Sequence, residues 1–122
     1  MLDAKTFVFN FSQKNKNYII RNLYYVKSID AYIAYTEKKT WDGTMRNIAF
    51  GSSPSLYHPN GDWFYDEKLD PLDVIHDEEK CIEVDFLPYI SDEDRAKVEK
   101  FNKELNEQGG SWIDIWPKEL DD

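Results

Sequence analysis

Short stretches in which apolar and polar side chains alternate recur along this chain, with turn-forming residues between them. Such alternation places every second side chain on the same face of an extended strand. It predicts strands at residues 6–12, 18–26, 29–36, 44–50, 81–87 and 111–116. Strands at this close spacing, joined by tight turns, indicate a mostly antiparallel sheet.

Individual strands differ in how clearly the pattern defines them. In the first, Phe7, Phe9 and Phe11 would share one face. The stretch 18–26 is partly apolar on both faces, which is typical of a central strand. Periodicity alone leaves a helix open for residues 18–36, and the many β-branched and aromatic residues there favour strands.

Two glycine turns suggest hairpins. Asp42-Gly43 offers the positive φ angles of a tight turn, with 44–50 as the return strand. Asn60-Gly61 lies between Leu56-Tyr57 and an aromatic run that begins at Trp63, which predicts a second, shorter hairpin. In the later strand 81–87, we expect Ile82, Val84 and Phe86 to point inward.

Helical signals concentrate near the C-terminus. Residues 92–108 predict one long helix, capped by Ser91, buried through Val98, Phe101 and Leu105, and ended by Gly109-Gly110. Asp70 before Pro71 predicts the N-cap of a short helix. The expected fold is a single α+β domain over residues 1–122, in which the long helix packs on one face of the sheet.

The charge of the chain is unevenly distributed. Its 24 acidic and 15 basic residues give a net charge of -9. Residues 1–60 contribute +4 and residues 61–122 contribute -13. This asymmetry suggests a basic partner and disfavours nucleic acid and anionic membranes, although plain solubility would explain it too. The lone Cys81, the early acid at Asp3 and the lack of a long apolar run lead us to expect a cytoplasmic protein.

Motifs for catalysis or metal binding are weak. Two histidines and one cysteine are too few for a structural zinc site, and we expect no metal and no cofactor. Cys81 and His76 could pair as nucleophile and base, but a buried cysteine in the core is the favoured interpretation. Lysines beside aromatic strands, such as Lys14 and Lys39, could bind single-stranded nucleic acid, but the acidic isoelectric point argues against it.

The stretch between Asp62 and Glu79 interleaves acids with large aromatic side chains. Tryptophan and tyrosine are enriched at binding hot spots, and acids around them would steer a basic partner. The alternative is that the aromatics belong to the core and the acids solvate a loop. The candidate partner-binding residues are Asp62, Trp63, Tyr65, Asp66, Glu67, Asp70, Asp73, Asp77, Glu78 and Glu79.

In its charge split and in this acidic aromatic stretch, the chain resembles bacterial toxin immunity proteins, including those of contact-dependent growth inhibition. The resemblance implies a small cytoplasmic protein without a catalytic site that binds and blocks a basic toxin, often a nuclease. An inhibitor that mimics DNA through its acids would have the same character. Two other classes of function stay open: a small hydrolase or nucleotide-handling enzyme using carboxylates of 62–79, and an adaptor module of a larger assembly.

Overall fold

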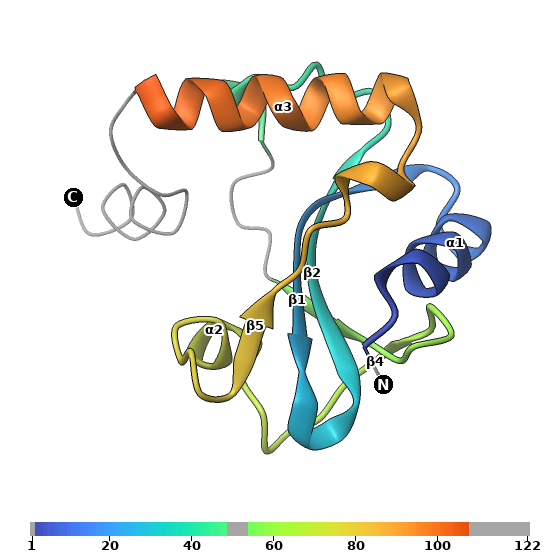
Figure 1. Cartoon of the computed structure of the whole chain (residues 1–122), viewed down its shortest axis with the longest axis vertical. Helices are drawn as coiled ribbons and strands as arrows, with labels where there is room; N and C mark the ends of the chain where they lie inside the picture. The colour runs from blue at the N-terminus through green and yellow to red at the C-terminus, as the bar shows by residue number, and fades with distance from the viewer. Residues whose placement is uncertain (1, 49–53, 108–122) are drawn as a thin grey trace.

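The computed structural model describes residues 2–48 and 54–107, and its five strands form one antiparallel sheet in the order β4-β3-β2-β1-β5 (Figure 1). The α+β class predicted from the sequence is therefore confirmed. The elements are α1 (Ala4–Lys14), β1 (Tyr18–Val26), β2 (Ala31–Lys38), β3 (Ser55–Tyr57), β4 (Trp63–Phe64), α2 (Pro71–Val74), β5 (Cys81–Glu83) and α3 (Asp92–Glu107). Short 3-10 turns are η1 (Lys27–Ile29), η2 (Met45–Asn47) and η3 (Leu87–Tyr89).

The hairpin β1–β2 forms the centre of the sheet. Its register places Tyr25 opposite Tyr32, and the chain reverses through η1 and Asp30, which has a left-handed φ of 48°. The hydroxyl of Tyr25 donates a hydrogen bond to Asp30 Oδ1 at 2.6 Å and so holds the turn against the strand. The predicted strand 18–26 is confirmed, and the predicted strand 29–36 lies two residues later in the chain, at 31–38.

The first predicted strand, at 6–12, is wrong, because these residues lie in helix α1. Asp3 caps this helix by accepting a hydrogen bond from the Thr6 N–H at 3.1 Å. Phe7 and Phe11 lie four residues apart, so they share a face in a strand and in a helix alike. Phe9 distinguishes the two structures, and its side chain is 62% exposed while Phe7 and Phe11 are buried.

Two other strand predictions need correction. After Asp42 the chain does not form a hairpin: residues 44–48 pass through η2, and positions 49–50 lie outside the described residues. Gly43 has the expected positive φ, of 86°, but it lies against the backbone of Lys97, where an added Cβ would meet the carbonyl oxygen at 2.7 Å. The predicted strand 81–87 is limited to 81–83, and Ile82 points outward, at 42% exposed.

Three further predictions for local structure are confirmed among the described residues. The Asn60-Gly61 turn joins β3 to β4, and Asp70 caps α2. Helix α3 begins where Ser91 Oγ accepts the Asp94 N–H at 3.2 Å, and it buries the predicted Val98, Phe101 and Leu105. The predicted stop at Gly109-Gly110 and the strand at 111–116 lie outside the described residues.

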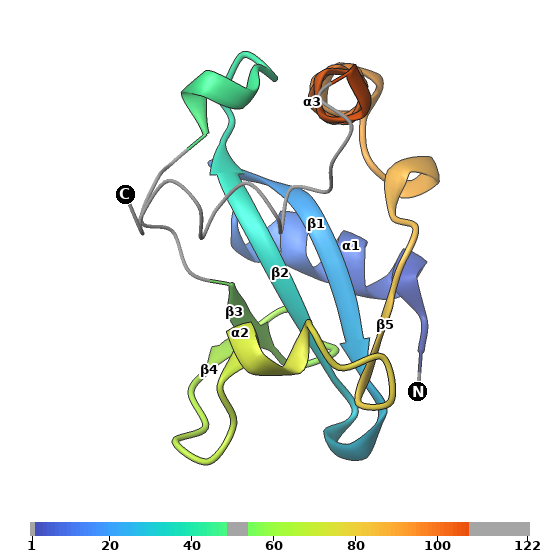
Figure 2. The ribbon, with the colours of Figure 1, turned by 90° about the vertical axis from the view of Figure 1, so that its left-hand side faces the viewer.

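Both faces of the sheet are covered (Figure 2). Helix α1 packs on one face, where Phe7 stacks on Tyr32 with ring centroids 4.1 Å apart, and the same core cluster includes Phe101 of α3. Helix α2 covers part of the other face, where Val74 and Ile75 join a smaller cluster around β1 and β2. None of the described helices combines the length and the apolar content needed to cross a bilayer.

Candidate functional site

The residues from Asp62 to Glu79, here called the acidic segment, lie toward the end of the molecule opposite α3 (Figures 1 and 2). The segment begins at the sheet edge in β4, continues through a loop and α2, and ends in the turn before β5. The ten predicted partner-binding residues therefore come from three parts of the chain. They are Asp62, Trp63 and Tyr65 near β4; Asp66, Glu67, Asp70 and Asp73 in the loop and α2; and Asp77, Glu78 and Glu79 before β5.

The start of the acidic segment is fixed to α1. Gly61 has a φ of 89°, and a Cβ there would lie 2.8 Å from the backbone of Asn10. The Asn10 side-chain amide donates to the Pro59 carbonyl at 3.2 Å. Lys14 Nζ lies 2.8 Å from Asp62 Oδ1, and its hydrogen bond holds the pKa of the Asp62 carboxyl below its usual range. The turn before β4 therefore has a fixed position on the helix.

Two large aromatic side chains project from this fixed turn into solvent. Trp63 is 64% exposed and Tyr65 is 70% exposed, so neither belongs to the core. Between them Phe64 is only half-buried, and its ring stacks on His58 with centroids 4.1 Å apart. Exposed tryptophan and tyrosine on an ordered backbone are well suited to fill pockets of a partner protein.

Several acids of the segment have a structural role. The carboxylates of Asp66, Asp70 and Asp77 each accept a hydrogen bond, at 2.9–3.0 Å, from the backbone N–H two residues later. This Asx-turn geometry substitutes for a backbone turn. Together with the ion-paired Asp62, these three residues shape the segment.

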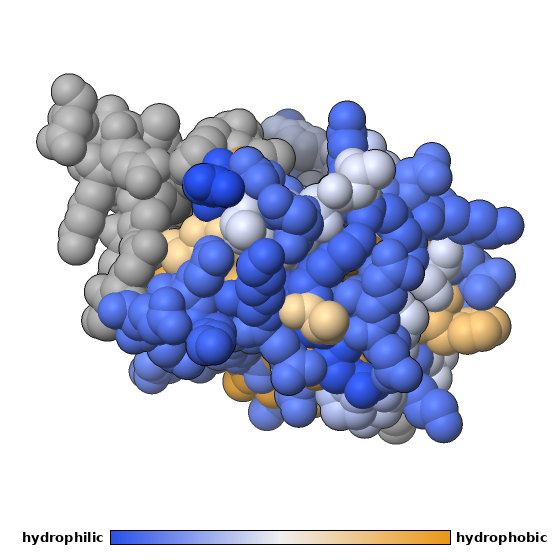
Figure 3. All heavy atoms as spheres, turned by 90° about the horizontal axis from the view of Figure 1, so that it is seen from above, coloured by the Kyte–Doolittle hydropathy of each residue, from blue (hydrophilic) through white to orange (hydrophobic). Residues whose placement is uncertain are grey.

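The other acids point into solvent. In the described part of the chain, the carboxylates of Glu67, Asp73, Glu78 and Glu79 form no hydrogen bond and no ion pair. Residues 62–80 contain eight acids against two lysines. By contrast, α3 contains six acids and four bases, some in pairs such as Lys97–Glu93, and its end of the molecule is mostly hydrophilic (Figure 3). The acidic segment therefore has a larger excess of negative charge than α3.

Two of the N-terminal lysines form ion pairs with acids from the second half of the chain. Lys14 pairs with Asp62, and Lys39 Nζ lies 3.1 Å from Asp94 Oδ2 on α3. Both lysines thus contact acids of the negatively charged half. A continuous positive groove is the expected feature of a single-strand binder.

The candidate nucleophile Cys81 is placed as a core residue. Its side chain is buried, and its Sγ–H donates to the carbonyl oxygen of Val74 at 3.1 Å. Burial raises the pKa of this thiol, with a smaller contribution from Asp77. An activated cysteine needs a lowered pKa, and its candidate base His76 is exposed. Within residues 2–48 and 54–107, no three His, Cys, Asp or Glu side chains are grouped as a metal site.

A second site, a cavity beside Asn22 in the middle of β1, has no recognisable signal in the sequence. The strand pattern predicts regular pairing there, whereas the register of β1 against β2 shifts between Ile20 and Asn22. An irregularity of this kind redirects side chains without a distinctive residue type.

Comparison of the chain with protein-family models, curated proteins and solved structures finds no match.

Proposed function

We propose that this protein is a non-enzymatic inhibitor, of the immunity-protein kind, that binds and blocks a basic toxin through the acidic segment. The observation that carries the proposal is the exposure of Trp63 and Tyr65 on a turn that packs against α1, beside carboxylates that have no partner among the described residues. Of the two sequence-based interpretations of these aromatics, core or surface, the structure agrees with the surface one.

The two kinds of side chain would have different roles in binding. The aromatics would supply most of the affinity, because rings that become desolvated in a partner's pockets are the usual hot spots. The free carboxylates Glu67, Asp73 and Glu78 would speed association with a basic surface and make it depend on salt. A toxin with a positively charged substrate cleft, such as a nuclease, is the partner that best matches this charge.

The test begins with parallel affinity capture from the native organism. The baits are the wild-type chain, the double variant Trp63→Ala/Tyr65→Ala, and Phe9→Ala as a matched control, since Phe9 is equally exposed but lies on α1. We expect a basic protein that wild type and Phe9→Ala retain and the double variant loses. Its affinity for the double variant should fall about 30-fold or more, as expected for loss of a hot spot.

A second measurement separates long-range electrostatic attraction, which acts on the association rate, from direct contacts, which act on the dissociation rate. In the triple variant Glu67→Gln/Asp73→Asn/Glu78→Gln, the association rate and its salt dependence should fall while the dissociation rate changes little. Co-expression of the wild-type chain should relieve the toxicity of the captured protein in a naive host. The proposal fails if the double variant binds the captured protein as tightly as wild type, or if that protein is harmless when expressed alone.

A further inference from the structure

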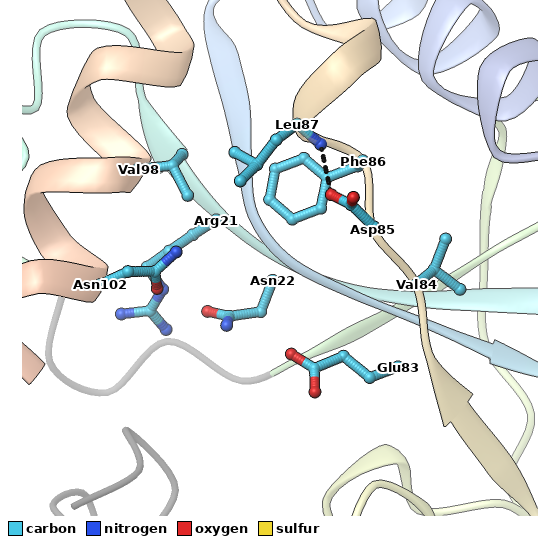
Figure 4. A pocket seen from close by; sticks show the side chains of 9 residues that line it. All are labelled: Arg21, Asn22, Glu83, Val84, Asp85, Phe86, Leu87, Val98 and Asn102. Carbon is cyan, nitrogen blue, oxygen red and sulfur yellow. Dashed lines mark hydrogen bonds between the residues drawn. The ribbon is translucent and has the colours of Figure 1, made fainter. Parts of the chain in front are cut away.

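A half-open cavity of about 370 Å³ lies between β1, the chain after β5 and α3 (Figure 4). This volume is in the range of small-molecule sites in proteins. Val84, Phe86 and Val98 form apolar walls. Figure 4 shows the polar ends of Asn22, Asn102 and Glu83 directed toward the same space, with the Arg21 guanidinium beside Asn102.

Asn22 contributes a buried acceptor to the lining of this cavity. Asn22 is 7% exposed, and its Oδ1 has no hydrogen-bond partner in the part of the chain that the structure describes. A buried acceptor left unpaired destabilises the folded state, so such atoms are rare unless a ligand or water completes them. Because Asn22 Oδ1 is an acceptor, the group that pairs with it must be a hydrogen-bond donor.

The charges around the cavity select a cation. The guanidinium of Arg21 lies 3.5 Å from the Glu37 carboxylate, which compensates its charge inside the protein. The carboxylates of Glu83 and Asp85 also line the cavity, and Glu83 is exposed. Asp85 accepts only the Leu87 N–H, at 3.2 Å, among the described residues. The groups lining the cavity therefore leave an excess of negative charge.

We propose that this cavity binds a guanidinium or ammonium group carried on a short alkyl chain. An N–H of the cation donates to Asn22 Oδ1, its charge faces Glu83, and its alkyl chain lies against Val84, Phe86 and Val98. The group can belong to a free amine or guanidine compound, or to an arginine or lysine side chain of another protein. The cavity contains no residue of the acidic segment, so this inference does not depend on the proposed function.

The direct test is an NMR titration of the ¹⁵N-labelled full chain with n-butylguanidinium. N-butylurea serves as the neutral compound of the same shape. We expect saturable shifts of the Asn22 and Asn102 side-chain amide signals, with at least tenfold weaker binding of the urea. The same titration with a blocked Gly-Arg-Gly peptide identifies the source. Tighter binding of the peptide would indicate a protein side chain, and tighter binding of n-butylguanidinium would indicate a free compound.

Variants then assign the contacts. Asn22→Leu should weaken binding of n-butylguanidinium about tenfold or more, because a hydrogen bond to a charged group is lost. Glu83→Gln lies at an exposed position and should weaken binding several-fold without altering the fold. Glu93→Gln removes the same charge at an exposed position of α3 outside the cavity and should leave binding unchanged. Shifts that do not saturate, or an equal effect of Glu93→Gln and Glu83→Gln, would overturn the proposal.

Discussion

The carboxylate of Asp42 organises the turn after β2, where the sequence predicted a hairpin. Its Oδ1 accepts hydrogen bonds from the Thr44 hydroxyl at 2.7 Å and the Thr44 N–H at 3.0 Å, and its Oδ2 accepts from Asn47 at 2.7 Å. These bonds, the Thr44 hydroxyl foremost, lower the pKa of Asp42 to about 2. The chain after β2 is thereby turned toward α3 instead of back along the sheet.

This arrangement predicts a pH dependence with a defined sign. The pKa of Asp42 in the folded state lies below the value of about 3.9 for an unfolded chain, so its stabilising effect is complete above that value. It is lost as the pH falls toward 2. Asp42→Asn should therefore lose less stability than wild type between pH 4 and pH 2, measured by urea unfolding.

NMR provides the residue-specific check on Asp42. The ¹³C signal of its carboxyl should titrate with a midpoint near pH 2, and Thr44→Val should raise that midpoint because the hydroxyl donor is removed. A midpoint near 3.9 in the folded wild-type chain would contradict the hydrogen-bond pattern described above.

At the scale of elements, α1 offers a matched pair of substitutions. Phe7 is 1% exposed and stacks on Tyr32, whereas Phe9 is 62% exposed. Phe7→Ala should lower the free energy of unfolding by about 3–5 kcal/mol, and Phe9→Ala should change it by less than about 0.5 kcal/mol. A strand with all three phenylalanines inward would make the two variants equally damaging, so urea unfolding of both distinguishes the structures.

The same element shows what the sequence could and could not determine. Residues whose local signal and tertiary role agree, such as Ser91 at the start of α3 or Gly61 in the β3–β4 turn, were predicted correctly. In α1 the spacing of Phe7 and Phe11 fits both a strand and a helix. Their packing against Tyr32 and Tyr57 decides in favour of the helix. Ile82 was misplaced because Val84 and Phe86 lie beyond the end of β5, so their burial does not extend back to the same face of the strand.

The candidate site, too, could be predicted from the sequence only in part. The acids and aromatics of the acidic segment are visible in the sequence, and the exposure of Trp63 and Tyr65 is visible only in the structure. The cavity at Asn22 had no sequence signal, because a register shift in β1 and residues of α3 create it jointly. Contacts between distant segments of this kind are what composition and periodicity cannot supply.

At the scale of the whole molecule, the net charge of -9 opposes compactness through repulsion among like charges. Screening this repulsion should raise the thermal unfolding midpoint by about 2–4 °C when NaCl increases from about 0.02 M to about 0.2 M. Differential scanning calorimetry checks this. The triple variant Glu67→Gln/Asp73→Asn/Glu78→Gln should respond less, and a midpoint that falls with salt would show that surface ion pairs dominate instead.

The three Asx turns of Asp66, Asp70 and Asp77 have a consequence for how the protein could be altered, by evolution or by design. An asparagine side chain can accept the same backbone hydrogen bond through its Oδ1, so each aspartate could lose its charge without loss of its turn. The backbone path of this region and its electrostatic potential are therefore separately adjustable. A lineage could change the charge of this surface while its scaffold stays the same.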